Sequence, residues 1–581
     1  MTTLAGRKVL VLDADMVPAL TITRSLAAQS CVVDVASHVA APIAGRSRRT
    51  SRKFRYPSPL ASPGKFVDWL CHHLAAEHYD LVIPVTERTL VPLSNARQRL
   101  SAAKVAMPGE HSLTLVLDKA QTLTLAEELG VAIPHSVTVA SLEELNDIQE
   151  TLHYPVVVKP ARSIGSKDGG ASHLQVSYAF DAVGLVARCK HALRYGAVVL
   201  QEYFGGDGVG VELIADQGAI HYAFQHRRLH EVPLTGGGSS LRVSEPLNPR
   251  LLEASAALIG ALQWHGVAMV EFKLDPQTGA FCLMEINGRF WGSLPLANAA
   301  GADFPAMLAQ LELNGRIGNF PDYRPGVYCR LLARDLWWYE SVLRGEGDPR
   351  LVKIPSTGEV IKELRLFLSP RHYFDVQNFS DPLPGLFDLV GILDSYAARL
   401  KSLANDWLFR RQQKRAWRNN VVMREVERAQ SILFLCYGNI NRSALADAMI
   451  RAYAEDSGVA IYSAGFHEES ARPADPMMVE IAAHNGVDMT WLRSTTVTDE
   501  MLRKSDVIFV MEKAHYDRLL AMRPDVEGRV FLLGAYPSRA PRHAEIGDPY
   551  GQSQQAYAQC YARIAESADH IKAMLAMRVE G

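Results

Sequence analysis

The sequence lacks long hydrophobic runs, paired cysteine motifs and an excess of either charge. Nowhere does it contain about 18 or more consecutive apolar residues, the length that a membrane-spanning helix needs. Its seven cysteines include no CxxC pair, which argues against both a disulfide framework and a zinc site. The 61 basic and 63 acidic side chains nearly cancel, so we expect no nucleic-acid partner. The first apolar run, in GRKVLVLDAD, is too short for a signal peptide, and we expect a cytoplasmic protein.

The length of the chain and the pattern of its first hundred residues predict several domains that begin with an α/β unit. A chain of 581 residues is too long for one hydrophobic core. In residues 1–108, KVLVLDAD, CVVDVAS and DLVIPV are typical of short buried strands, and helical patterns separate them, which predicts a doubly wound α/β domain. No GxGxxG follows the first strand, so a dinucleotide-binding turn is missing there.

Three further segments follow the first one. Residues 109–315 alternate strand patterns with glycine-rich turns, which predicts an α+β domain. Residues 316–428 form a connecting segment in which we assign no chemistry. It includes a basic helix at residues 399–419, and such helices can lie on anionic membranes, although a solvated linker helix is the commoner outcome. Residues 429–581 return to alternating strands and helices and predict an α/β domain with a four-stranded parallel sheet.

The segment CYGNINRS lies between the apolar run SILFL and an amphipathic helical pattern. A loop in this position directs backbone N–H groups inward at the positive end of a helix dipole, which favours an anion and the thiolate form of Cys436. Arg442 can hold two oxygens of a phosphoryl group, and Ser443 can donate a hydrogen bond to the sulfur. A lone cysteine is usually only buried, but the C-x5-R-S spacing favours a nucleophile. The expected phosphate loop comprises Tyr437, Gly438, Asn439, Ile440 and Asn441.

A phosphocysteine mechanism also needs a proton donor for the leaving oxygen. Asp548, in a DPY segment after the last predicted strand, is the candidate, and Tyr550 would line the mouth of the pocket. An isolated Asp-Pro pair is usually only a turn. Residues 430–581 resemble the low-molecular-weight protein tyrosine phosphatases in CYGNINRS, YSAG, DVIFVME and DPY. This resemblance implies that Cys436 is the nucleophile, Arg442 the phosphate clamp, and Asp548 first the general acid and then the base.

Two residues depart from that family's pattern. Asn441 stands where the family often has a second cysteine, so a protective disulfide within the loop is not expected. Ala444 replaces a proline that often follows the loop serine. Arsenate reduction occurs on the same fold and is an alternative, but it would need further cysteines, and only Cys560 remains in this domain. Phosphatase activity is therefore the preferred interpretation.

The middle segment contains candidates for binding a polyphosphate and a metal. The strand VVVKP ends near Lys159 and leads into a Gly/Ser-rich loop, which can be either a flexible turn or a phosphate lid. Glu271 and Glu285 lie on two apolar strands that we expect to pair, and with Asn287 they offer oxygen ligands for Mg²⁺. The alternative is a pair of surface glutamates on a hairpin. Arg289 is placed to hold an anionic substrate.

These residues resemble the ATP-grasp superfamily, in particular its carboxylate-amine ligases, over residues 1–315. The resemblance implies ATP and Mg²⁺ as cofactors and transfer of the γ-phosphoryl group to a substrate carboxylate, followed by attack of an amine. Arg227, Arg228 and the TGGGSS loop are expected on the acceptor side, although adjacent arginines are more often surface residues. The expected ATP-binding residues are Lys119, Lys159, Ser166, Gly169, Gly170, Gln201 and Glu202.

Three hypotheses remain open for the whole chain. The first is a bifunctional enzyme, an ATP-dependent ligase fused to a phosphatase, acting on a small carboxylate and amine and on a phosphotyrosine-like monoester, for which a phosphotyrosine protein is a candidate partner. The second is a phosphatase regulated by a non-catalytic ATP-sensing module. The third is a membrane-associated scaffold that uses the basic helix. The complete sets of candidate residues favour the first.

Overall fold

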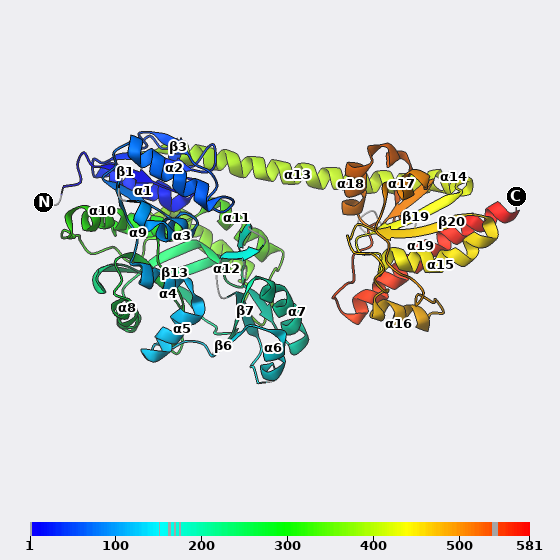
Figure 1. Cartoon of the computed structure of the whole chain (residues 1–581), viewed down its shortest axis with the longest axis horizontal. Coiled ribbons are helices and arrows are strands. Elements are labelled where there is room, and N and C mark those ends of the chain that lie inside the picture. The colour runs from blue at the N-terminus through cyan, green and yellow to red at the C-terminus, as the bar shows by residue number, and fades with distance from the viewer. Residues whose placement is uncertain are drawn as a thin grey trace. The chain divides into compact units, whose positions relative to one another are not determined.

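The computed structural model of the protein describes residues 3–100, 102–149, 151–160, 164–167, 170–173, 176–536 and 544–580. The chain divides into two units, Met1–Leu393 and Asp394–Gly581. Figure 1 follows their elements from blue at the N-terminus to red at the C-terminus. The predicted class, α/β and α+β with several domains, is confirmed.

The first sheet of the N-terminal unit is parallel, with strand order β3-β2-β1-β4-β5. Apart from Lys8, its central strands β1 and β4 consist of buried apolar side chains, because helices cover both faces of such a sheet. The strand order reverses at β1, and crevices at the carboxyl ends of strands at such a point commonly hold ligands. The elements are β1 (Lys8–Val11), α1 (Val17–Ala28), β2 (Val32–Ser37), β3 (Lys53–Arg55), α2 (Pro63–Ala76), β4 (Leu81–Ile83), α3 (Glu87–Asn95) and β5 (Lys104–Val105).

A small antiparallel sheet follows, with order β10-β7-β11-β6. It has its own apolar core, in which Val156, Val158, Leu185 and Leu200 are buried. A separate two-stranded hairpin carries the Gly/Ser-rich segment. The elements are α4 (Glu110–Leu117), α5 (Lys119–Glu128), β6 (Ser136–Val139), α6 (Leu142–Ile148), β7 (Val156–Pro160), β8 (Ile164–Lys167), β9 (Gly170–His173), β10 (Ser177–Ala179), α7 (Ala182–Ala192) and β11 (Val198–Glu202).

The third sheet has seven strands, in the order β16-β15-β12-β13-β14-β17-β18. Its last two strands, β17 and β18, lie within residues 316–428, the segment to which the sequence analysis assigns no chemistry. The TGGGSS segment is partly strand, because β14 begins at Gly238. The elements are β12 (Asp207–Asp216), β13 (Ala219–Val232), β14 (Gly238–Glu245), α8 (Pro249–Ala261), β15 (Gly266–Leu274), β16 (Phe281–Asn287), α9 (Leu294–Ala300), α10 (Phe304–Asn314), β17 (Tyr328–Arg330), α11 (Leu332–Leu343), α12 (Thr357–Glu363) and β18 (His372–Phe374).

The C-terminal unit contains the predicted four-stranded parallel sheet, with order β20-β19-β21-β22. Every residue of its central strand β19 is buried. The elements are α13 (Pro382–Arg418), which begins in the first unit, α14 (Val421–Arg428), β19 (Ser431–Cys436), α15 (Arg442–Ser457), β20 (Ala460–Gly465), α16 (Pro476–His484), α17 (Asp499–Lys504), β21 (Val507–Val510), α18 (Lys513–Met522), β22 (Val530–Leu532) and α19 (Gln554–Glu580).

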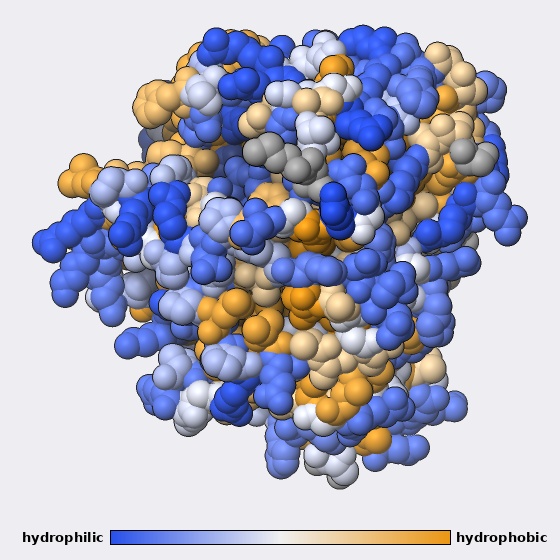
Figure 2. All heavy atoms as spheres, turned by 90° about the vertical axis from the view of Figure 1, so that its left-hand side faces the viewer, coloured by the Kyte–Doolittle hydropathy of each residue, from blue (hydrophilic) through white to orange (hydrophobic). Residues whose placement is uncertain are grey.

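The surface drawn in Figure 2 is mainly hydrophilic, with hydrophobic side chains gathered toward its lower half. Scattered apolar atoms are usual on a folded protein and indicate no binding site by themselves. Within the described part of the chain, no helix combines the length and the hydrophobicity needed to cross a membrane.

Candidate functional site

The loop between β19 and α15 surrounds the sulfur of Cys436, which is buried at the end of its strand. The backbone N–H of Asn439 donates to Sγ at 3.2 Å, and Ser443 Oγ lies 2.9 Å from it. Asn439 adopts a positive φ of 53°, a conformation that asparagine tolerates better than most residues. Its Oδ1 accepts from Thr495 N at 2.8 Å, which holds the turn from the side. The loop therefore surrounds the sulfur with hydrogen-bonding groups.

Arg442 is buried at the start of α15 and makes charged contacts on two sides. Its Nη1 donates to Glu512 Oε2 at 2.6 Å, and its Nη2 donates to Asp548 Oδ2 at 2.7 Å. Burial by itself would lower the pKa of Arg442, but the charges of Cys436, Asp548 and Glu512 raise it above its usual value. The guanidinium is therefore a fixed cation beside the sulfur. Glu512 is a site residue to which the sequence reasoning gave no role.

A cavity of about 230 Å³ opens over the sulfur. Arg442 and Asp548 both line it, so the three predicted catalytic groups share one pocket. Tyr437 and Tyr550 line it as well, and about half or more of each side chain is exposed. The remaining lining residues are Gly438, Ile440, Asn441, His467 and Arg472. The structure thus brings together a nucleophile, a cation, a carboxyl group and aromatic walls.

Gly465, the last residue of the YSAG segment, packs directly against the backbone of the phosphate loop. A Cβ atom at this position would lie 2.6 Å from Tyr437 O and 2.9 Å from Asn439 N. Both atoms belong to the backbone of the phosphate loop, and Tyr437 O also accepts from His467 N at 2.9 Å. The loop can therefore keep this conformation only because residue 465 has no side chain.

Two buried groups near the pocket are electrically neutral. Burial, helped by the charges of Arg442 and Arg518, lowers the pKa of His515 to about 3. Burial raises the pKa of the Cys560 thiol to about 12. Because the thiolate is the reactive form, Cys560 is poorly suited to relay an oxidation. This disfavours the arsenate reductase alternative.

The carboxylates predicted to bind a metal lie side by side in the seven-stranded sheet. Glu271 on β15 is the cross-strand partner of Glu285 on β16. Asn287 Nδ2 donates to Glu271 Oε1 at 3.0 Å and to Glu285 Oε1 at 3.3 Å, so oxygens of both carboxylates converge on one amide. Two carboxylates and an amide are the kind of donors that Mg²⁺ takes, and the residues fit that ion.

Cations surround these carboxylates. Lys119 Nζ lies 3.3 Å from Glu285 Oε2, and Arg228 Nη2 lies 2.5 Å from Glu271 Oε2. Burial opposes ionisation of Glu285, but Lys119, Lys159 and Arg289 lower its pKa to about 2. Both glutamates are thus balanced by neighbouring positive charges. Arg228, predicted on the acceptor side, pairs directly with a candidate metal ligand.

Lys159 on β7 projects into the same region. Its Nζ donates to Gln201 Oε1 at 2.5 Å. Burial, together with the charge of Lys119, lowers the pKa of Lys159 to about 8. Glu202 is half-buried at the end of β11. Of the predicted loop residues, Ser166 belongs to β8 and Gly170 to β9, while Gly169 lies outside the described residues.

A cavity of about 400 Å³ joins these groups. Its lining includes Val157, Gln201 and Tyr203 as well as Gly238 and Arg334. The lining also includes the lysines, the two glutamates, Asn287 and Arg289. The volume and the mixture of apolar and cationic walls suit a nucleotide with its phosphates beside the carboxylates.

Arg334, at the start of α11, is a cavity residue that the sequence did not single out. Its Nη1 occupies the space beside Gly238, where a Cβ would lie 2.0 Å from it. Burial and the charges of Arg242 and Arg228 lower the pKa of Arg334. Among the described residues, no carboxylate or carbonyl lies within ion-pairing or hydrogen-bonding distance of its guanidinium. Within the described part of the chain, Arg334 is thus a cation of the cavity wall that has no acidic partner.

A second cavity of about 420 Å³ also reaches Lys119, Glu285, Asn287 and Arg289. Residues at the carboxyl end of the first sheet close it, including Thr86 and Glu87. Arg289 Nε lies 3.5 Å from Glu87 Oε1. The predicted substrate residue Arg289 therefore faces both cavities.

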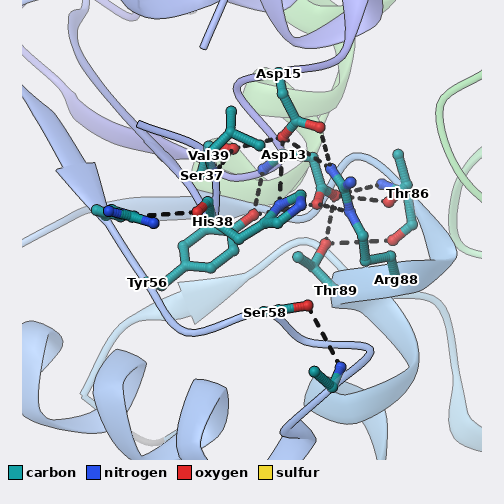
Figure 3. A network of polar contacts seen from close by, with 12 residues as sticks. Asp13, Asp15, Ser37, His38, Val39, Tyr56, Ser58, Thr86, Arg88 and Thr89 are labelled. Atoms are coloured by element: carbon teal, nitrogen blue, oxygen red, sulfur yellow. Dashed lines mark hydrogen bonds and ion pairs between the residues drawn. The ribbon is translucent and has the colours of Figure 1, made fainter. Parts of the chain in front are cut away.

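A buried polar network fixes the wall of this second cavity (Figure 3). The Asp13 carboxylate accepts hydrogen bonds from Thr86, Thr89 and Arg88 at 2.6–3.0 Å. Arg88 also reaches both oxygens of Asp15 at 2.9 Å. Since Asp13 and Asp15 already neutralise the guanidinium of Arg88, this residue holds the cavity wall in place. Arg289 is then the cation that lies nearer the candidate metal-binding carboxylates.

Comparison with known proteins matches the two regions separately. Residues 431–580 match the family "Low molecular weight phosphotyrosine protein phosphatase", and residues 194–333 match "ATP-grasp in the biosynthetic pathway with Ter operon". The Etp low molecular weight protein-tyrosine-phosphatase of Escherichia coli is 34% identical over 138 residues, which are 24% of this chain and 89% of Etp.

Solved structures resemble the larger part of the chain. An L-amino acid ligase from Bacillus licheniformis aligns with 53% of this chain and 74% of its own, at 17% identity and a TM-score of 0.43. N5-carboxyaminoimidazole synthetase from Staphylococcus aureus, complexed with ADP, aligns with 64% of this chain and 99% of its own, at 13% identity and a TM-score of 0.47.

Proposed function

The chain belongs to the low molecular weight protein tyrosine phosphatases through residues 431–580 and carries an ATP-grasp domain, and from this premise we propose that it is a bifunctional enzyme. One centre hydrolyses aryl phosphate monoesters through a phosphocysteine. The other uses ATP and Mg²⁺ to join a carboxylate to an amine. The cytoplasmic location expected from the sequence stays a prediction.

In the proposed phosphatase reaction, the Cys436 thiolate attacks phosphorus while Asp548 gives a proton to the leaving oxygen. Arg442 holds the equatorial oxygens as the dianion replaces Asp548 on Nη2. A water molecule, deprotonated by Asp548, then attacks phosphorus and releases the sulfur, which Ser443 stabilises through its hydroxyl. The mechanism rests on the position of Arg442, which lies in one pocket with Cys436 and forms an ion pair with Asp548. The exposed rings of Tyr437 and Tyr550 favour an aromatic ester.

The proposed phosphatase is tested with p-nitrophenyl phosphate. We expect Cys436→Ser to abolish hydrolysis, because a serine hydroxyl at this position stays protonated and is a weak nucleophile. Cys282→Ser, in the other unit, is the matched control and should leave hydrolysis unchanged. Residual activity of Cys436→Ser near that of the wild type would refute the assignment.

In the proposed ligase reaction, the cavity beside Gln201 and Glu202 holds the nucleotide, with its phosphates toward Lys159 and Lys119. Glu271, Glu285 and Asn287 would hold Mg²⁺, which supplies charge neutralisation on the transferred phosphoryl group. Arg289 orients the acceptor carboxylate for attack on the γ-phosphorus. This forms an acyl phosphate and ADP, and an amine then displaces phosphate.

The convergence of Glu271 and Glu285 on the Asn287 amide carries this second proposal. The test is ADP release with amino acids and sugar acids as candidate acceptors, with products identified by mass spectrometry. We expect release to require a carboxylate and an amine together, and Glu285→Gln to abolish it while exposed Glu128→Gln does not. ADP formation without an acceptor requirement would count against the ligase, and tight ATP binding without turnover would instead indicate an ATP-sensing module.

A further inference from the structure

Helix α13 carries a heptad repeat that the two catalytic centres do not use. Leu386, Leu393, Leu400 and Trp407 recur at every seventh residue, and a second series, Leu383, Val390, Ala397 and Ala404, is offset from it by three or four residues. Every one of these side chains is exposed; Leu393 and Leu400 are 68% and 66% exposed. Apolar residues at both core positions of successive heptads are the pattern of a coiled coil.

Both ends of α13 are packed against other parts of the chain. Near its start, Asp388 Oδ2 accepts from Gln377 at 2.7 Å. Near its end, Trp417 Nε1 donates to Leu532 O at 3.0 Å, and Gln413 Oε1 accepts from Leu532 N at 2.9 Å. Between these contacts the helix is largely exposed, and the heptad stripe, from Leu383 to Trp407, is exposed over its whole length. At 1.5 Å per residue, the stripe is about 38 Å long, between three and four heptads.

We propose that this stripe binds the same stripe of a second copy of the chain, as an antiparallel two-stranded coiled coil. In the register that we infer, Ala397 packs opposite the partner's Leu400, and Leu393 packs opposite the partner's Ala404. Each of these layers matches a large side chain with a small one, and Val390 similarly meets the partner's Trp407. Such alternation lets facing side chains interdigitate without voids.

Charges beside the stripe agree with the same register. In an antiparallel coiled coil, the residue that follows the second core position of a heptad lies opposite the equivalent residue of the partner helix. In this register Asp394 meets the partner's Lys401, and symmetry makes the pair twice. At the equivalent flanking position, Phe387 meets the partner's Leu408, so the apolar contact extends beyond the core.

The charge of the stripe favours a second copy over a lipid surface. Between Leu383 and Leu408 the helix has three acidic residues, Asp388, Asp394 and Asp406, and two basic ones, Arg399 and Lys401. The basic helix that suggested membrane contact covers residues 399–419, but five of its seven basic residues lie from Arg410 onward, and Arg410 binds Glu545 at 2.6 Å. An anionic membrane would attract a helix whose polar flanks are mainly basic, and these are not.

Light scattering coupled to size exclusion tests the interface on the full chain. We expect a mass twice the 64.1 kDa of one chain at micromolar concentrations. The double substitution L393E/L400E should give a monomer, while the matched pair A398E/N405E, on an exposed face outside the stripe, should stay dimeric. All variants should keep phosphatase activity, which shows that they fold. A monomeric wild-type chain, or a dimer unaffected by L393E/L400E, would overturn the proposal.

A charge exchange tests the antiparallel register. Asp394→Lys or Lys401→Asp alone places like charges together and should weaken dimerisation about tenfold or more, and the combined D394K/K401D should restore it. In a parallel dimer these two positions do not face each other, so failure of the double variant to recover would contradict the register. Flotation with phosphatidylcholine and phosphatidylserine vesicles should show no binding, and binding abolished by L393E/L400E would show that the stripe serves lipid instead.

Discussion

Replacing Gly465 with alanine should disable the phosphatase without touching a catalytic group. The new Cβ would lie 2.6 Å from Tyr437 O, about 0.8 Å short of an ordinary contact of 3.4 Å. Since Tyr437 O is also bonded to His467 N, the strain falls on the loop that holds the sulfur. A displacement approaching 1 Å at a reacting centre costs about 100-fold in rate, and we expect kcat/KM to fall by about that factor.

The assay is hydrolysis of p-nitrophenyl phosphate, with thermal unfolding measured beside it. Overpacking of this kind costs about 1–3 kcal/mol, so Tm should fall by several degrees while the fold persists. Gly528→Ala is the matched control, because its Cβ would meet no atom within 4 Å and it should change neither quantity. If Gly465→Ala kept kcat/KM within twofold of the wild type, the proposed role of this glycine in shaping the loop would be refuted.

Three further predictions address both centres. Asp548→Asn should lower kcat for p-nitrophenyl phosphate by about 10²–10⁴-fold, since no proton donor replaces the carboxyl group, and an unchanged kcat would exclude it as the acid. Because the pKa of Lys159 is lowered to about 8, the free protein should hold this side chain mostly neutral at about pH 9, and the phosphates of a bound nucleotide should restore its proton. Titration calorimetry in buffers of different ionisation enthalpy should then show proton uptake at about pH 9, none at about pH 6, and none at either pH in Lys159→Met. Because Arg334 lies against Gly238 of the TGGGSS segment, which we expect on the acceptor side, Arg334→Gln should raise the KM of the acceptor more than that of ATP in the ligase reaction, and equal changes would argue against that placement.

The sequence predicted those parts of the sites that are carried by local motifs. Cys436 and Arg442 are fixed by one loop between a strand and a helix, and Glu271 and Glu285 by two adjacent strands whose alternation determines which way they point. The positions of these residues could be predicted from the local periodicity of the sequence alone. The four-stranded parallel sheet could be predicted from apolar runs of ordinary strand length.

Other site residues depend on packing between distant segments. Glu512 reaches Arg442 across 70 positions of the chain, and Arg334 enters the cavity from a helix that follows β17. Strands β17 and β18 have three residues each, too few to show a periodic pattern, so the segment that contains them gave no sign of belonging to the large sheet. Arg228 was expected to bind the acceptor. Strand β12 pairs with β13, which carries Arg228, and with β15, which carries Glu271, and this pairing determines whether Arg228 contacts the substrate or Glu271.

The central claim is that one chain contains two independent catalytic centres, and measuring both activities in the same pair of variants tests it most directly. Cys436→Ser should lose aryl phosphate hydrolysis and retain acceptor-dependent ADP release, while Glu285→Gln should lose ADP release and retain hydrolysis. Loss of both activities in either folded variant, or loss of neither, would contradict the account.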